Sequence, residues 1–392
     1  MKFFRRRKTD QPAADCNPEC SYRKGWRAST ATMLIGAVGA TITGVAYMAT
    51  LIFLAPKLPP ITEADVPGLC GWAGEEAAQA SYQRLAKHFA KFQIRGVDHD
   101  HTKARAVLWD ASVVVQGKHL ATFRQEIGDC VGSGAKQAVD YLQCVEMVRT
   151  GETEFKAVYE PYHYACGRMA PDCGAGRIRG PDGSIGSDQA HALTLYGVLA
   201  GDLPGLEPYS AKVVKQWAVR MPEARWLQEG KKHLVRSAAP VRSADEVREA
   251  ICNGYPITIA SSWGGQMRPP AKDGRLVNHR VTTWQHQMCI IGYDGATGKE
   301  PYWYILNSWG EDAHGKPPDD APPGGFWVTR KDVEFIVRQG DSFALSQFDG
   351  FPAQEWVILT SRDRPRTMPE AQAIVKRAIA ARFNQVARVE DN

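Results

Sequence analysis

The most continuous apolar stretch of the chain lies near its N-terminus. Residues 31–55 contain no charged side chain, and as a helix they are long enough to cross a hydrocarbon core of about 30 Å. A cleaved signal peptide usually has a shorter apolar region that ends in a small-residue cleavage site. The long run, with Pro56 directly after it, therefore favours an uncleaved single-pass signal-anchor, and a cleaved signal is the alternative.

The pattern of the remaining chain predicts helices first and strands later. A Pro-rich spacer over residues 56–67 is followed by a predicted helix over 74–94, and together they form a predicted stalk over 56–98. Further helices are predicted at 130–142, 187–199 and 243–253, the last opening with a Ser243–Glu246 capping box. Short strands are predicted at 257–262, 288–293, 302–309 and 325–330. This order indicates an α+β domain over residues 99–355.

Charge gives the predicted anchor an orientation. Residues 1–27 carry eight basic and three acidic side chains, an excess equal to the net charge of the whole chain, +5. The positive-inside rule therefore predicts that residues 1–30 are cytoplasmic and that the chain after Pro56 lies outside the cytoplasm. The rest of the chain is close to neutral and has no dense Lys/Arg stripe, so no nucleic-acid partner is expected.

Two other segments suggest contacts with a membrane or with a second chain. Gly36, Ala40 and Gly44 share one face of the predicted membrane helix, and small residues at this spacing allow two helices to pack closely. A homodimer through this face is one hypothesis, and ordinary membrane-helix composition is the other. The basic tail over 356–392 contains a predicted amphipathic helix at 369–383, either a contact surface or a plain surface helix.

The cysteines fit an extracytoplasmic domain. Of nine cysteines, two precede the anchor and seven follow it, and an odd number leaves at least one thiol free or paired between chains. Cys166 and Cys173 bracket a short loop and are the predicted disulfide. Cys289 lies in a strand-like apolar run and is predicted to be a buried thiol. His99 and His101, with acidic neighbours, suggest a metal site, but a solvated loop is favoured.

Three segments carry candidate chemistry. Cys130 opens a predicted helix, whose positive end favours the nucleophilic thiolate. His286 begins one strand and Asn307 ends the next, so an antiparallel hairpin brings the two side by side. An Asn bound to one imidazole nitrogen leaves the other nitrogen for a thiol, which is a Cys–His–Asn arrangement. His279 and His314 have no matching Asn on a paired strand.

These segments resemble the papain-like cysteine peptidase family. The family has a Gln before its catalytic Cys, then a His on a strand, then Asn-Ser-Trp-Gly, which correspond here to Gln125, Cys130, His286 and residues 307–310. The resemblance covers about residues 100–355. It implies a two-lobed fold, with a helical lobe beside a β-barrel-like lobe, preceded here by the transmembrane helix.

The resemblance also implies roles for these residues. Cys130 would attack a peptide carbonyl, His286 would hold and deliver the proton, and Asn307 would orient His286 while Trp309 shields their bond. The side chain of Gln125 and the backbone N–H of Cys130 would bind the oxyanion. The substrate cleft, which would take a protein or peptide, would be lined by Gly183, Ser184 and Gly186. No metal or organic cofactor is required.

The chain departs from the family at several positions. Val131 stands where the family has an aromatic residue, Ile127 replaces a disulfide-bonded Cys, and Gln125 is one residue closer to the nucleophile than usual. Asp129 would raise the pKa of the thiol unless it points away. An endopeptidase is favoured, and the alternatives are a silent peptide-binding module or a peptidoglycan-peptide hydrolase or acyl transferase. Only the helix at 74–94 could act as an inhibitory segment, and a simple stalk is the other interpretation.

The anchor predicts a measurable topology. The full-length protein should stay with membranes after an alkaline carbonate wash, and protease added to intact cells should reach the domain beyond residue 67. A thiol reagent that does not cross membranes should label free cysteines of the domain and spare Cys16 and Cys20. A soluble form that begins just after residue 55 would contradict the anchor, and labelling of Cys16 from outside would contradict the orientation.

Overall fold

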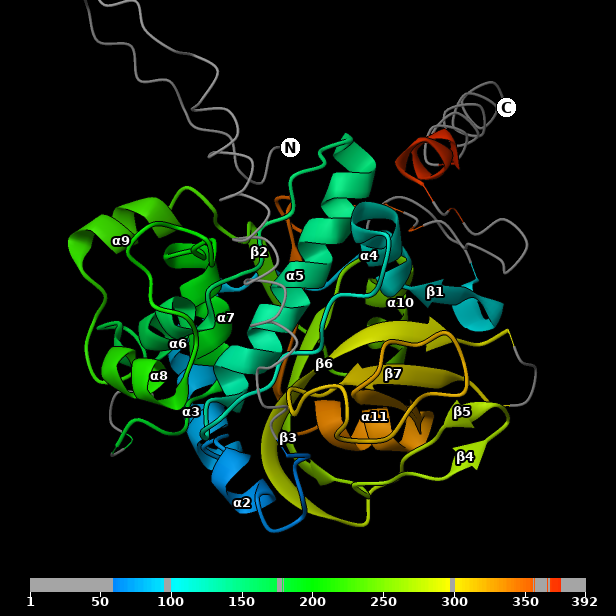
Figure 1. Cartoon of the computed structure of the whole chain (residues 1–392), viewed down its shortest axis with the longest axis horizontal. Helices are drawn as coiled ribbons and strands as arrows, with labels where there is room; N and C mark the ends of the chain where they lie inside the picture. The colour runs from blue at the N-terminus through cyan, green and yellow to red at the C-terminus, as the bar shows by residue number, and fades with distance from the viewer. Residues whose placement is uncertain are drawn as a thin grey trace, which may run out of the picture. The chain divides into compact units, whose positions relative to one another are not determined.

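A seven-stranded antiparallel sheet organises the C-terminal half of the domain (Figure 1). Its strand order is β2-β9-β3-β6-β7-β8, and β1 also pairs with β6. A separate two-stranded sheet joins β4 to β5. The strands are β1 (Arg105–Val107), β2 (Ser237–Pro240), β3 (Ile257–Gly264), β4 (Ala271–Lys272), β5 (Arg275–Leu276), β6 (Thr282–Asp294), β7 (Tyr302–Leu306), β8 (Gly325–Thr329) and β9 (Asp341–Ser346). The end strands β2 and β8 do not pair with each other, so the sheet is not a closed barrel.

Helices form the other half and also cover the sheet. Helix α5 packs on β6 and on α6, so it joins the two halves, and in Figure 1 α6 to α9 gather on the side of α5 away from the sheet. The helices are α2 (Val66–Leu69), α3 (Glu75–Leu85), α4 (Trp109–Gln116), α5 (Cys130–Thr150), α6 (Glu160–Met169), α7 (Gly186–Leu195), α8 (Ala211–Trp217), α9 (Ala224–Gly230), α10 (Ala244–Cys252) and α11 (Arg330–Val337). Short 3₁₀ turns are η1 (Ala86–His88) and η2 (His101–Lys103).

The computed structural model describes residues 59–94, 100–174, 178, 180–296, 300–354, 356, 365 and 367–374. The predicted cytoplasmic segment and the predicted anchor over 31–55 lie outside these residues. Within the described residues, no helix has the length and apolar character needed to span a membrane. The predicted tail helix is described only in part, as helical residues 368–374.

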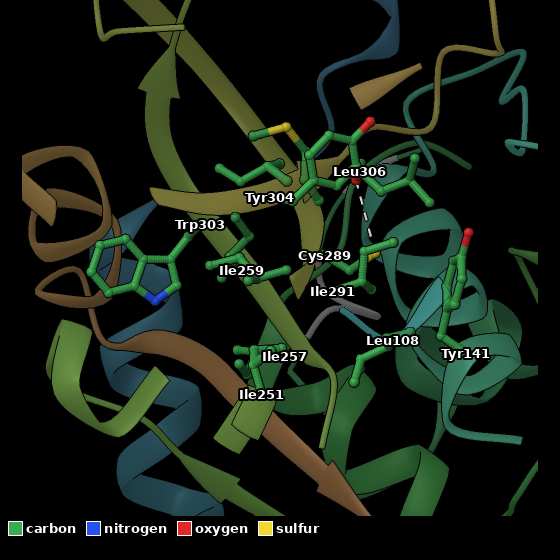
Figure 2. Packing of buried hydrophobic residues seen from close by; sticks show 14 of the residues in the cluster. Leu108, Tyr141, Ile251, Ile257, Ile259, Cys289, Ile291, Trp303, Tyr304 and Leu306 are labelled. Carbon is green, nitrogen blue, oxygen red and sulfur yellow. Dashed lines mark hydrogen bonds between the residues drawn. The ribbon is translucent and has the colours of Figure 1, made fainter. Parts of the chain in front are cut away.

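The main core fills the space between α5, α10 and the inner face of the sheet. Figure 2 shows apolar side chains from separate parts of the chain, including Leu108, Ile251, Ile257 and Trp303, packed into one cluster. Cys289 belongs to it as a fully buried thiol, as predicted, and its sulfur donates to the carbonyl oxygen of Leu306 at 3.8 Å. Burial of this continuous cluster is the main force that holds the helical region against the sheet.

The segment predicted as a stalk packs into the domain instead. Ile61, Val66 and Leu69 are buried in the main core, so packed structure already begins at residue 61. The predicted helix over 74–94 ends early, because after η1 the chain turns extended at Phe89 and the amide of Ala90 bonds to the sheet. A tethered stalk would expose these apolar residues, and their burial explains why the segment folds onto the domain.

The predicted Cys166–Cys173 disulfide is absent, because all seven cysteines among the described residues are free thiols. Cys166 lies within α6, not in an irregular loop, and its side chain is buried in an apolar cluster with Tyr162 and Leu199. The sulfur of Cys173 donates instead to the carbonyl oxygen of Asp188 at 3.7 Å. The two thiols therefore have different partners.

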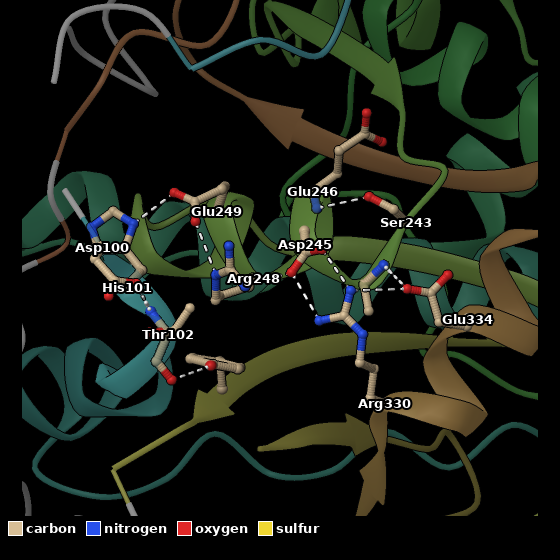
Figure 3. Close-up of polar contacts among 12 residues, drawn as sticks. Asp100, His101, Thr102, Ser243, Asp245, Glu246, Arg248, Glu249, Arg330 and Glu334 are labelled. Carbon is tan, nitrogen blue, oxygen red and sulfur yellow. Dashed lines mark hydrogen bonds and ion pairs between the residues drawn. The ribbon is translucent and has the colours of Figure 1, made fainter. Parts of the chain in front are cut away.

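Polar contacts around α10 attach neighbouring segments to it (Figure 3). Ser243 caps the helix by accepting a hydrogen bond from the amide of Glu246 at 3.1 Å, as the sequence predicts. His101 contacts Glu249 at 2.6 Å and so ties η2 to α10, while Arg330 pairs with Asp245. His101 is buried, so the solvated loop favoured from the sequence is wrong at this residue, and no cluster of metal-binding side chains occurs in the described part of the chain. His99 lies outside it.

The close packing at Gly292 predicts a stability effect. A Cβ at this position in β6 would lie 2.7 Å from the ring of the buried Trp109, so Gly292→Ala should force a shift in the core. Such overpacking typically costs about 1–3 kcal/mol in the free energy of unfolding, measurable by urea denaturation. Gly68→Ala is the matched control, because nothing lies within 4 Å of its Cβ position. An equal effect of both substitutions would contradict this account.

Candidate active site

Cys130 opens α5, and its side chain is fully buried. The sulfur accepts hydrogen bonds from two backbone amides, that of Gly71 at 3.2 Å and that of Gln287. Burial nevertheless raises the pKa of the Cys130 thiol well above its ordinary value, because it outweighs the two amides that favour the thiolate. In this arrangement Cys130 is therefore a neutral thiol, despite its place at the start of a helix.

His286 and Asn307 lie side by side, as the hairpin geometry predicts. Cys289 of β6 faces Leu306 of β7 in the antiparallel register, and His286 Nε2 lies 2.8 Å from Asn307 Oδ1. Because the amide oxygen only accepts hydrogen bonds, the imidazole proton is on Nε2. Nδ1 has no hydrogen-bond partner among the described residues, and the next residue, Gln287, donates its amide to the Cys130 sulfur.

Burial also determines the charge of His286. It lowers the pKa of His286 to about 4, although the hydrogen bond to Asn307 favours the charged form. The imidazole is therefore neutral at neutral pH, with Nδ1 available to accept a proton. Trp309 packs against this ring with a centroid separation of 4.8 Å and is itself buried, which is the shielding position expected of it.

A second histidine holds Asn307 from the other side. His314 Nδ1 faces the carbonyl oxygen of Met267 at 3.1 Å and must donate to it, which leaves Nε2 as an acceptor for Asn307 Nδ2 at 2.9 Å. Asn307 Oδ1 also accepts from the amide of Ser308 at 2.7 Å. These contacts determine which end of the Asn307 amide faces His286.

The side chain of Gln125 is buried beside the same loop. Its Oε1 accepts a hydrogen bond from Ser308 Oγ at 2.5 Å, so its Nε2 is directed the other way. Nε2 donates to the carbonyl oxygens of Leu69 and Ile127, both at 2.8 Å. The N–H group expected to face an oxyanion is therefore already bonded to a carbonyl oxygen from the N-terminal part of the domain.

Residues 69–73, here called the strap, cross the site from one side to the other. Gly71 donates its amide to the Cys130 sulfur, and its carbonyl oxygen accepts from the amide of Ser184 at 2.8 Å. The amide of Trp72 donates to the carbonyl oxygen of Gln285 at 2.9 Å. A Cβ on Gly71 would lie 1.8 Å from the carbonyl oxygen of Gly128, so only glycine fits here. The strap thus binds like an extended peptide over the cysteine.

The buried side chain of Trp72 holds the strap in place. It is buried against Val131, Ile185 and Ala260, and its Nε1 donates to Asp341 Oδ2 at 2.8 Å. Asp341 is fully buried and also accepts the amides of Gly186 and Ser187, both at 2.7 Å. Burial raises the pKa of Asp341 to about 6 in spite of these three donors.

The Asp129 carboxylate, which precedes the Cys130 thiol, has polar partners from other segments. Its Oδ2 accepts a hydrogen bond from Tyr209 at 2.8 Å, and its Oδ1 lies 3.4 Å from Gln125 Nε2. Burial raises the pKa of Asp129 to about 7, and the pKa of the neighbouring Glu160 is raised by burial too. The Asp129 charge adds to the rise in the Cys130 pKa, as expected, but burial is the larger cause.

The structure brings only part of the predicted cleft lining to the cysteine. Ser184 pairs with the strap, and Gly183, at φ +87°, donates its amide to the carbonyl oxygen of Gly128, two residues before Cys130. Gly186 instead faces Asp341, which also binds Trp72.

One protein-family model matches the part of the chain that contains Cys130, His286 and Asn307. The model of the papain family cysteine protease matches residues 115–316, just over half of the chain. The chain belongs to the papain family of cysteine proteases. It is therefore a cysteine peptidase, a hydrolase of the papain type, whose substrates are proteins or peptides. No curated protein matches the chain.

Several solved cysteine-protease structures are similar to this chain at low sequence identity. Xylellain, a cysteine protease from Xylella fastidiosa, is 12% identical, with a TM-score of 0.46 over 72% of this chain and 97% of that one. Bromelain protease from Ananas comosus, solved with the E64 inhibitor, is 15% identical, with a TM-score of 0.41 over 62% and 99%. Procathepsin L 3 of Tenebrio molitor larval midgut is 12% identical, with a TM-score of 0.41 over 69% and 79%.

Sequence reasoning missed three parts of this papain-family site. His314 was set aside because no paired strand carries it, yet a loop returns it to Asn307. Asp341 comes from β9, far along the chain, and nothing in its sequence neighbourhood points to the site. The strap had one usable signal: Leu-Cys-Gly-Trp is an apolar segment inside a stretch interpreted as exposed.

Weakening the strap should expose the cysteine. Trp72→Ala removes a buried indole and its bond to Asp341, and losses of this kind reach about 3–5 kcal/mol, so alkylation of Cys130 by iodoacetamide should accelerate at least about tenfold. Trp72→Phe keeps a ring and should accelerate it less. Mass spectrometry of the Cys130 peptide over time gives both rates. Unchanged alkylation in Trp72→Ala would show that the strap does not control access.

Proposed function

We propose that this protein is a membrane-anchored cysteine endopeptidase that acts outside the cytoplasm through Cys130, His286 and Asn307. The observation that carries the proposal is the hydrogen bond from His286 Nε2 to Asn307 Oδ1. It leaves Nδ1 as a base with no other hydrogen-bond partner among the described residues. The Cys130 sulfur lies against the amide of Gln287, the residue next to that base.

The chemistry follows from these positions. Nδ1 of His286 takes the thiol proton, and the Cys130 thiolate attacks the carbonyl carbon of a peptide bond. The imidazolium then gives its proton to the leaving amine as the C–N bond breaks, which forms a thioester. Water, deprotonated by His286, attacks this thioester and releases the carboxylic acid and the thiol.

Gln125 stabilises the negative charge that develops on the carbonyl oxygen. Its Nε2 and the backbone N–H of Cys130 serve as the oxyanion donors in this proposal, and losing one such donor typically costs about 10²–10³ in rate. In the closed strap, Gln125 Nε2 donates a hydrogen bond to the carbonyl oxygen of Leu69 at 2.8 Å. The strap therefore engages a donor that the oxyanion needs.

The closed strap makes the enzyme latent in this proposal. It covers the sulfur, engages Gln125 and pairs with Ser184, where an extended substrate would pair. Catalysis therefore requires the strap to leave, after which water and substrate enter. Entry of solvent removes the burial that keeps Cys130 and His286 neutral, and so favours the thiolate–imidazolium pair.

The location outside the cytoplasm rests on the chain before the domain. The uncharged run over residues 31–55 and the basic residues before it support a single membrane crossing with the N-terminus inside. Protease domains held at a membrane surface act on substrates that reach that surface. The topology experiment described above tests this part separately from the chemistry.

The catalytic assignment is tested by Cys130→Ala and His286→Ala in the Trp72→Ala background, where the strap is weakened. Each should lower kcat for a fluorogenic peptide by about 10⁴-fold or more, because nucleophile and base act as a unit. Cys173→Ala and His279→Ala are matched controls and should keep the rate. Substantial hydrolysis by the Cys130→Ala protein would refute the assignment. Binding of peptides without turnover by the Trp72→Ala protein would favour a silent binding module, and cleavage of peptidoglycan stem peptides alone would favour the hydrolase alternative.

A further inference from the structure

Cys70, in the strap, lies next to the nucleophile. Gly71 N is 3.2 Å from Cys130 Sγ, and two covalent bonds spanning about 2.4 Å separate Gly71 N from Cys70 Cα. Cys70 Cα therefore lies within about 5.6 Å of Cys130 Sγ. The three bonds that would join that Cα to the Cys130 sulfur in a disulfide reach about 4–4.5 Å, so the backbone at Cys70 is already close to the separation that a disulfide requires.

The two sulfurs also share one edge of β6. The Cys70 sulfur accepts the amide of Gln285, and the Cys130 sulfur accepts the amide of Gln287. Residues two apart on a strand direct their N–H groups to the same side, so both thiols are held on that side, on either side of His286 along the strand. Cys70 is only partly buried, so a reagent from solvent reaches it before it reaches the fully buried Cys130.

We propose that Cys70 and Cys130 form a reversible disulfide that locks the strap over the nucleophile. This inference rests on the proposed function of Cys130. The oxidant is a low-molecular-weight disulfide or a protein disulfide of the same chemistry. Cys70 attacks it as the thiolate and forms a mixed disulfide, releasing one thiol. His286 Nδ1 takes the proton of the Cys130 thiol, whose sulfur displaces the second thiol from the Cys70 sulfur, and the leaving thiolate takes up that proton.

The reaction transfers two electrons and two protons from the two cysteine thiols to the external disulfide. The two cysteine thiols are oxidised to one S–S bond, and the external disulfide is reduced to two thiols. A reducing dithiol reverses both exchanges and returns Cys70 and Cys130 as free thiols, the form that this structure shows. Because the strap keeps the partners adjacent, closure within the chain outcompetes attack by a second external thiol.

The test uses the full-length protein in detergent, treated with oxidised glutathione, quenched in acid and alkylated. Non-reducing peptide mapping should show one cross-linked peptide that contains Cys70 and Cys130. Labelling of Cys130 by an epoxysuccinyl inhibitor should fall at least tenfold and return fully with a phosphine reductant. The Cys173→Ser protein, which changes the other partly buried thiol, should behave like the parent.

The Cys70→Ser protein should form no cross-link, and oxidised glutathione should leave the labelling of its Cys130 by the inhibitor unchanged. If the parent gave only a mixed disulfide with glutathione, or if Cys130 cross-linked to another cysteine, the proposal would be overturned. Peptide hydrolysis is measured in parallel with the reduced Trp72→Ala protein, in which the strap is weakened. A cross-link in the parent without any hydrolysis by the reduced Trp72→Ala protein would count against the proposed function and leave the disulfide standing, whereas hydrolysis without a cross-link would count against the disulfide alone.

Discussion

The antiparallel pairing of β6 with β7 is the constraint on which the site depends. The register that sets Cys289 opposite Leu306 carries His286 to the end of β7, where Asn307 begins the following loop. The same strand supplies the amide of Gln287 to the Cys130 sulfur and the carbonyl oxygen of Gln285 to the strap. A slip of one residue would turn His286 to the other face of the sheet and away from Asn307. The aromatic packing around Gly292 and Trp109 holds this register in place.

Burial gives the closed protein its chemical state. It raises the pKa of Cys130 and lowers that of His286 to about 4, so both changes favour a neutral thiol beside a neutral imidazole. The helix dipole at Cys130 acts in the opposite direction but is the smaller influence while the strap excludes water. The same groups are thus unreactive when covered and able to form an ion pair when solvent enters. Reactivity depends on what covers the site as much as on which residues form it.

The sequence was sufficient for the residues whose placement is local. Cys130 is found because it begins a helix, and His286 and Asn307 because one hairpin connects them. The α+β class follows from the change of periodicity near residue 257. The contacts made by Asp341 and by residues 69–73 join parts of the chain far apart in sequence, and His314 reaches Asn307 through an irregular loop, so no periodicity encodes them. The disulfide prediction failed for the same reason, because spacing between Cys166 and Cys173 does not say which way each side chain points.

The departures from the usual papain-family pattern form one connected arrangement around Cys130. The shortened loop between Gln125 and Cys130 turns tightly, with the amide of Asp129 bonded to the carbonyl oxygen of Ile127. A buried carboxyl there would be costly without partners, and Tyr209 donates to it from a separate segment before α8. The hydroxyl oxygen of Tyr209 also accepts a hydrogen bond from the amide of Glu126 at 3.0 Å, which is a second contact with this loop. Asp129 is therefore better understood as the partner that binds the loop to the helical region, with Gln125 held in position as a result, than as a substitution that removes the chemistry.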